Sequence, residues 1–131
     1  MSPILFSNHE QYLWAAFELY VYELLQKQFS ECKISVQPNL SSGLKPDFVL
    51  ECDSKVVVVD AKAKERISKR DIIQIVDYVY EIDADYGILF VVDYTEVSES
   101  IENFATANAI EIEYTNWRRG DINWTKKRSL N

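Results

Sequence analysis

Two carboxylates and one lysine near the middle of the sequence have the types and spacing to bind a metal ion and act on a phosphate ester. Asp47 begins one apolar segment, and Asp60-Ala61-Lys62 follows a run of four valines, residues 56–59. Residues i and i+2 of a strand share a face, so Asp60 and Lys62 project side by side while Ala61 offers its backbone carbonyl. The valine run is apolar on both faces, which predicts a buried strand with this pair near its end.

The turn between the two segments brings the carboxylates together. Residues 53–54, Asp-Ser, are a hairpin signal, and symmetric pairing about them places Asp47 opposite Asp60. Converging carboxylates repel and raise each other's pKa unless a cation lies between them. Mg²⁺ prefers carboxylate, carbonyl and water oxygens, so Asp47, Asp60 and the carbonyl of Ala61 are candidate metal ligands.

Lys62 would supply further chemistry at such a site. Its ammonium group could orient or help to deprotonate an attacking water and would favour negative charge on a phosphate. The alternative is structural: Asp60 and Lys62 form an ion pair at the sheet edge, and Asp47 only starts a strand.

A third carboxylate, Glu18, falls on the core-facing side of the first predicted helix. On a helical wheel the apolar stripe consists of Trp14, Phe17, Val21, Leu24 and Leu25, with Tyr22 at its edge. Glu18 lies between Leu25 and Tyr22, where a carboxylate is costly unless it has a partner. It is expected either to join the acidic cluster as a direct or water-mediated metal ligand, or to reach solvent or pair with a lysine.

Gln74 and Tyr78 are spaced i, i+4 in the second predicted helix and therefore share a face. The opposite, apolar face is predicted to consist of Ile72, Ile73, Val76 and Val79. This placement favours a solvated glutamine. Because the helix follows the Asp60-Ala61-Lys62 strand, however, Gln74 could instead lean over the strand end and hold water or phosphate.

The elements that must position these residues alternate between helix and strand. Helices are predicted over residues 10–29, from Ser68 to about 82, and from a Thr95 cap to about 108, and strands over 33–37, 47–52, 56–61, 87–93 and 110–114. Ser68 followed by Asp71 has the spacing of an N-terminal capping box. The order αβββαβαβ predicts an α/β domain around a mixed sheet flanked by helices.

Composition bounds the class of protein. A chain of 131 residues with 47% hydrophobic residues predicts one domain with a substantial core. It has no membrane-length apolar run and no signal-peptide pattern at its start, which favours a cytoplasmic location. Cys32 and Cys52 lack metal-site spacing and lie far from His9, so both are expected to be reduced thiols. Three glycines provide no Gly-rich phosphate loop, which disfavours a nucleotide-binding enzyme.

Charge is unevenly distributed along the chain. The net charge of −7 argues against nucleic-acid binding by bulk electrostatics, yet the tail 117–131 is basic, with Arg118, Arg119, Lys126, Lys127 and Arg128 against Asp121. These residues could contact phosphate while Trp117 or Trp124 stack on bases. If so, deleting residues 117–131 should weaken DNA binding and leave the fold intact. Packing or dimer contacts by the tryptophans, or a solvated terminus, are the alternatives, and packing is slightly favoured.

Taken together, these residues resemble the PD-(D/E)xK, or restriction-endonuclease-like, nuclease superfamily. The matching positions are Glu18, Pro46-Asp47, Asp60-Ala61-Lys62, and the segment QIVDY at residues 74–78, which is similar to the Q-x-x-x-Y motif of RecB-like members. The order αβββαβαβ over about residues 10–114 resembles the superfamily core. The sequence looks most like nuclease domains of modification-dependent restriction systems, with Holliday-junction resolvase-like proteins as relatives. Asp60 departs from the commoner Glu of the third motif.

The resemblance implies an endonuclease that hydrolyses DNA phosphodiester bonds with Mg²⁺, or with Mn²⁺ as a substitute. Asp47, Asp60 and Ala61 would hold the metal, Glu18 would be an auxiliary ligand, Lys62 would assist the attacking water and Gln74 would position it. Tyr78 and the basic tail would contact nucleic acid.

Partners and activity are left open by the resemblance. Cutting both strands of a duplex favours a homodimer, and target recognition could come from another subunit or a larger complex. The alternative function is a catalytically inactive member of the same fold that binds nucleic acid or serves in assembly. Chemically competent residues at all the motif positions favour the active nuclease.

Overall fold

The computed structural model describes residues 2–40 and 42–117, and side chains from Tyr12 onward. Its elements are α1 (Ser2–Gln28), β1 (Lys33–Val36), β2 (Phe48–Cys52), β3 (Lys55–Lys62), α2 (Lys69–Ile82), β4 (Tyr86–Val91), α3 (Glu99–Ala107) and β5 (Ile110–Tyr114). The predicted order αβββαβαβ is confirmed, although α1 begins well before the predicted start at residue 10. None of the helices in the described residues is long and apolar enough to cross a membrane.

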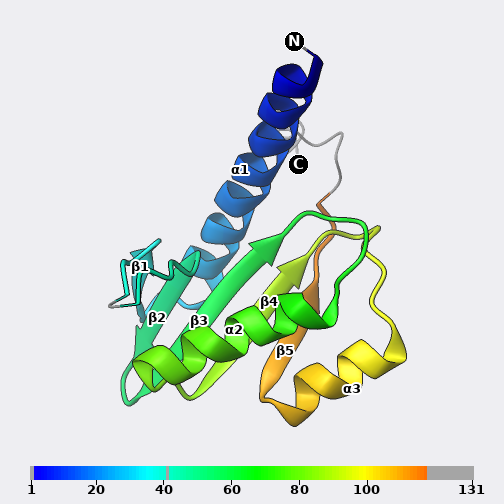
Figure 1. The fold of residues 1–131 in the computed structure, drawn as a ribbon. Coiled ribbons are helices and arrows are strands. Elements are labelled where there is room, and N and C mark those ends of the chain that lie inside the picture. The colour runs from blue at the N-terminus through cyan, green and yellow to red at the C-terminus, as the bar shows by residue number, and fades with distance from the viewer. Residues whose placement is uncertain (1, 41, 118–131) are drawn as a thin grey trace.

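The five strands form one mixed sheet in the order β1-β2-β3-β4-β5. Strands β1, β2 and β3 pair antiparallel, whereas β3, β4 and β5 pair parallel. Figure 1 shows α1 on one face of the sheet and α2 and α3 on the other. Strand β3 therefore lies in the interior of a three-layer domain, as the valine run predicted.

Two apolar cores fill the spaces between the sheet and its helices. Val57 and Val59 of β3 pack in the core under α1, while Val58 packs in the core under α2. All three valines are almost completely buried. Because both faces of β3 are covered by helices, its apolar residues do not alternate with polar ones.

The β2–β3 hairpin sets the register on which the site depends. Phe48 pairs with Val59 and Cys52 with Lys55 across the turn at residues 53–54. One further step along this register places Asp47 beside Asp60, as the symmetric pairing predicted.

Two predicted details of the helices are wrong. Ser98, rather than Thr95, is the N-cap of α3, and the Thr95 hydroxyl instead donates a hydrogen bond to the Lys64 carbonyl at 2.7 Å. In α2 the buried apolar residues are Ile72, Ile75 and Tyr78, while Ile73 is 42% exposed. Of the predicted apolar face, Ile72, Val76 and Val79 do pack in the core under α2, and only Ile73 does not.

The prediction of two reduced cysteines is also wrong, because Cys32 and Cys52 form a disulfide with a Cα–Cα distance of 4.4 Å. The antiparallel register that pairs Lys33 with Glu51 makes these cysteines neighbours across β1 and β2. The prediction used spacing along the chain, whereas the bond depends on the register between two strands.

Candidate active site

The predicted catalytic residues meet in one cavity of about 270 Å³ at the carboxyl-terminal end of β3. The cavity is built by α1, the segment before β2, the end of β3 and α2. Its lining residues are Trp14, Glu18, Lys45, Asp47, Asp60, Ala61, Lys62, Ala63, Lys64, Gln74 and Tyr78.

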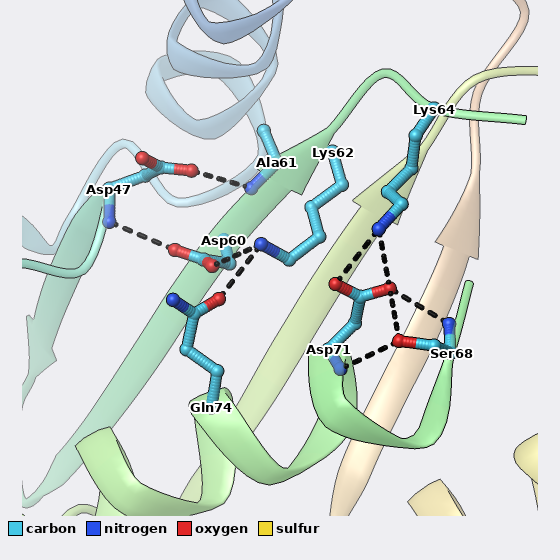
Figure 2. Close-up of polar contacts among 8 residues, drawn as sticks. All are labelled: Asp47, Asp60, Ala61, Lys62, Lys64, Ser68, Asp71 and Gln74. Atoms are coloured by element: carbon cyan, nitrogen blue, oxygen red, sulfur yellow. Dashed lines mark hydrogen bonds and ion pairs between the residues drawn. The ribbon is translucent and has the colours of Figure 1, made fainter. Parts of the chain in front are cut away.

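Asp47 and Asp60 are fixed by hydrogen bonds to each other's strand segments. The backbone N–H of Asp47 donates to Oδ1 of Asp60 at 3.0 Å, and the backbone N–H of Ala61 donates to Oδ2 of Asp47 at 2.8 Å (Figure 2). The two carboxylates are therefore oriented by backbone groups, which move less than side chains do.

Lys62 projects on the same side of β3 as Asp60, as the alternation predicted. Its Nζ lies 3.5 Å from Oδ2 of Asp60 and donates to Oε1 of Gln74 at 2.9 Å. Figure 2 shows Gln74 reaching from α2 toward the end of β3. Gln74 therefore leans over the strand end while its side chain stays exposed, and whether it holds water or phosphate there remains a prediction.

Glu18 and Tyr78 complete the lining of the cavity from the two helix layers. Glu18 of α1 is half-buried, and its carboxyl group lies within hydrogen-bonding reach of Asp47. Tyr78 of α2 is only 4% exposed and lines the same cavity. The structure thus brings Glu18 into the acidic cluster instead of directing it to solvent.

Burial and mutual repulsion change the proton affinities of these carboxyl groups. Desolvation is the main cause that raises the pKa of Asp47 to about 6 and that of Asp60 to about 7. The neighbouring Glu18 charge adds to the first effect and the Asp47 charge to the second, while Lys62 opposes the second. Desolvation likewise raises the pKa of Glu18.

The donor set fits a hard divalent cation by its chemistry. Glu18, Asp47 and Asp60 bring three carboxyl groups to one cavity, where burial raises their pKa values and a bound cation would stabilise their charged forms. Among the described residues, no group of three His, Cys, Asp or Glu side chains is already arranged as a set of ligands. The fit to a divalent cation therefore rests on the carboxylate type of the donors and on their location in one cavity.

Four residues that line the cavity were not predicted as site residues: Trp14, Lys45, Ala63 and Lys64. The Trp14 indole N–H donates to the Ala63 carbonyl at 3.1 Å, and Lys64 lies next to Lys62 on the cavity wall. Behind this wall Asp71, which was predicted only as a helix cap and does not itself line the cavity, pairs with Lys64 at 3.0 Å. The repeated spacing of Asp60, Lys62 and Lys64 was the available signal, because all three would share one face if the extended conformation continued.

The predicted basic tail lies almost entirely beyond the described residues. Arg118, Arg119, Trp124, Lys126, Lys127 and Arg128 all fall outside them. Trp117 is described, is 2% exposed and packs against Phe17 with ring centroids 5.2 Å apart. Packing, the favoured reading for the tryptophans, is therefore correct for Trp117.

Comparison with known proteins identifies the fold. No family model and no curated protein matches the sequence, but solved structures do. SfsA of Pyrococcus furiosus, solved with Ca²⁺, has 14% identity and a TM-score of 0.52 over 80% of this chain and 56% of that one. A repair endonuclease from Pyrococcus abyssi has 16% identity and a TM-score of 0.56, covering 72% of this chain and 45% of that one. EndoMS in complex with double-stranded DNA has 15% identity and a TM-score of 0.57, covering 76% and 44%.

The likeness is one of fold, because these identities are low and the chain spans about half the length of each structure. The chain has a restriction-endonuclease-like α/β fold, with the mixed sheet and flanking helices that the sequence predicted.

Proposed function

We propose that this chain is a metal-dependent nuclease that hydrolyses phosphodiester bonds of DNA, with Mg²⁺ as its ion and Mn²⁺ as a substitute. One observation carries the proposal: Glu18, Asp47, Asp60 and Lys62 share a single cavity on a restriction-endonuclease-like fold. The structural neighbours add support, because one is a repair endonuclease, another was solved with double-stranded DNA and a third with Ca²⁺.

In this proposal the acidic residues bind the cation. Glu18, Asp47, Asp60 and the Ala61 carbonyl would hold Mg²⁺, which when bound would polarise a phosphate oxygen and lower the pKa of a water molecule. Asp47 and Asp60 need little rearrangement, because their hydrogen bonds to the backbone already orient them.

Lys62 would act on the phosphate and the attacking water. Its ammonium group can stabilise negative charge that develops on the phosphate oxygens. Gln74 would act as a positioning residue, because its Oε1 accepts a hydrogen bond from Lys62 Nζ. The pKa of Tyr78 is raised to about 12, chiefly by burial, so its hydroxyl stays protonated and could donate to the substrate.

A cleavage assay tests the proposal. The purified chain would be incubated with plasmid, linear, single-stranded and four-way-junction DNA in EDTA, Mg²⁺ or Mn²⁺. We expect metal-dependent cleavage that falls at least about 100-fold in Lys62→Ala, because a charge-stabilising donor is lost. Lys55→Ala is the matched control, since Lys55 is exposed at the opposite end of β3.

The assay also separates the alternatives. A folded wild-type chain that cuts none of these DNAs and binds no divalent ion would overturn the nuclease and support a catalytically inactive binding or assembly module. Cutting both strands of a duplex usually needs two sites, so we include a homodimer in the proposal. Target recognition could come in addition from another subunit or a larger complex. Sedimentation as a monomer in the presence of DNA would contradict the homodimer.

A further inference from the structure

A second lysine is held at the same cavity by a second carboxylate. Lys64 lies two residues beyond Lys62 and lines the cavity with it. Its Nζ lies 3.0 Å from Oδ2 and 3.2 Å from Oδ1 of Asp71, at the start of α2 (Figure 2). Two lysine–aspartate pairs therefore stand at the end of β3, and the proposed function uses only one of them.

The backbone that carries Lys64 is also fixed. Thr95 donates to the Lys64 carbonyl at 2.7 Å from the segment after β4, and Trp14 of α1 donates to the preceding carbonyl at 3.1 Å. Three separate parts of the chain thus hold this residue and its neighbour in place.

Asp71 is buried more deeply than a surface ion-pair partner. The residue is 8% exposed, and its Oδ2 also accepts hydrogen bonds from the Ser68 backbone N–H at 2.8 Å and the Ser68 hydroxyl at 3.1 Å. The nearby Arg66–Glu96 pair, in contrast, has side chains that are 78% and 72% exposed. Exposed ion pairs of that kind contribute little to the stability of a fold. The Lys64–Asp71 pair, in contrast, includes a buried carboxylate that also forms the N-terminal cap of α2.

Lys64 retains the capacity to bind an anion. Its side chain is 39% exposed, and an ammonium group has three protons to donate. The same cavity holds three carboxylates, which would repel an entering phosphodiester. Lys45 and Lys62 offset part of this repulsion, and Lys64, which is held in place at the same cavity, would offset more of it.

We propose that Lys64 binds a phosphate oxygen of the substrate strand and that Asp71 is a positioning residue that holds Lys64 at the cavity wall. The inference rests on the proposed function, since its ligand is the phosphodiester backbone of DNA.

Binding without metal tests the role of Lys64. Fluorescence anisotropy would measure binding of a short fluorescein-labelled DNA duplex in EDTA over a range of salt concentrations. We expect Lys64→Ala to weaken binding about fivefold and to reduce the slope of log affinity against log salt by about 0.9, as for one lost phosphate contact. Lys64→Arg should keep most of the affinity, and Lys55→Ala, which removes an equal charge at the far end of β3, should bind like the wild type.

The outcomes distinguish the two proposals. Wild type and Lys64→Ala with equal affinity and equal salt slope would overturn the role of Lys64 and leave the proposed function standing. A folded wild-type chain that binds no DNA in EDTA would also overturn the role of Lys64, while the cleavage assay with Mg²⁺ decides the proposed function separately.

The role of Asp71 needs a control for its part in the helix cap. Asp71→Asn and Ser68→Ala both weaken the cap, but only Asp71→Asn frees Lys64. We expect Asp71→Asn to raise KM with little change in kcat, Ser68→Ala to raise KM less because Asp71 still pairs with Lys64, and Asp71→Glu to restore KM. In a Lys64→Ala background, Asp71→Asn should cause no further loss. Equal KM values for Asp71→Asn and Ser68→Ala would overturn the positioning role. So would a rise in KM on adding Asp71→Asn to Lys64→Ala that is as large as the rise in the wild-type background.

Discussion

Asp60 combines burial with a charge that the fold does little to neutralise. The residue is 4% exposed, the Asp47 carboxyl group lies beside it, and Lys62 is 3.5 Å away. The acidic cluster therefore destabilises the folded protein when no cation is bound. Functional sites commonly lower the stability of a fold in this way.

The destabilisation by the Asp60 charge predicts how the stability of the folded protein depends on pH in EDTA. The pKa of Asp60 is about 7 in the folded protein and near its ordinary value of 3.8 when unfolded. The folded state therefore holds the proton more tightly, and this group's contribution to stability falls as pH rises from about 4 to about 7. We expect Asp60→Asn, which keeps an acceptor for the Asp47 N–H, to be more stable than wild type by about 1–3 kcal/mol at pH 8, with a smaller difference at pH 5.

Urea unfolding in EDTA at several pH values measures this difference. Glu18, Asp47 and Lys62 face Asp60, so the comparison uses variants that leave all three in place. Glu51→Gln on the exposed part of β2 is the control. A difference between wild type and Asp60→Asn that does not change with pH would contradict the prediction.

At the scale of elements, what could be predicted from the sequence followed from local geometry. The valine run and the Asp-Ser turn predicted the position of β3, its burial and its register with β2. The proximity of Asp47, Asp60 and Lys62 could therefore be predicted from the sequence. The exposure of Ile73 and the burial of Ile75 in α2 could not, because they depend on how the helix rests on two strands. The same holds for the Cys32–Cys52 bond, which depends on the register of β1 with β2.

The disulfide predicts a stability difference that does not involve the site. It joins residues separated by 20 positions, and a loop of this length is expected to stabilise the folded state by about 3 kcal/mol. Reduction, or replacement of Cys32 and Cys52 by Ser, should lower the free energy of unfolding by about that amount. Cleavage activity should persist under conditions where the protein stays folded, because Cys52 lies at the end of β2 opposite Asp47.

Urea unfolding with and without reductant measures the effect, and titration of thiols in denaturant measures the bond itself. The double Ser variant serves as the control and should not respond to reductant. Two free thiols in the untreated protein would contradict the prediction. A free energy of unfolding that is the same with and without reductant would also contradict it.

At the scale of the whole molecule, the net charge is negative, and a group of positive charges lies at the cavity. The net charge is −7, yet Lys45, Lys62 and Lys64 line one cavity. Bulk attraction to DNA is therefore weak, and we expect binding to depend on a small number of lysines at the site, with any contribution of the basic tail to be measured separately.

Chain truncation measures that contribution, but it must start beyond Trp117. Deleting residues 117–131 would remove a core side chain, and losing a buried tryptophan costs about 3–5 kcal/mol. A chain ending at residue 117 should unfold at nearly the wild-type temperature, whereas a chain ending at 116 should be clearly less stable. If the tail binds DNA, the chain ending at 117 should also show weaker anisotropy binding with a flatter salt dependence.

Equal thermal stability of the two truncated chains would show that Trp117 does not support the core. Binding by the chain ending at 117 that matches the full chain would show that the tail does not contact DNA.

The two ends of the sheet are connected differently. Away from the site, the connections at 53–54, 83–85 and 108–109 are tight, and Asp53, Asp83 and Ala109 adopt positive φ angles of 53°, 55° and 59° within them. At the site end, the connections at 37–47, 63–68 and 92–98 are longer. The entropy cost of lengthening a loop grows slowly with its length. Evolution or protein engineering could therefore add recognition loops around the cavity one at a time, while the strand that carries Asp60 and Lys62 stays unchanged.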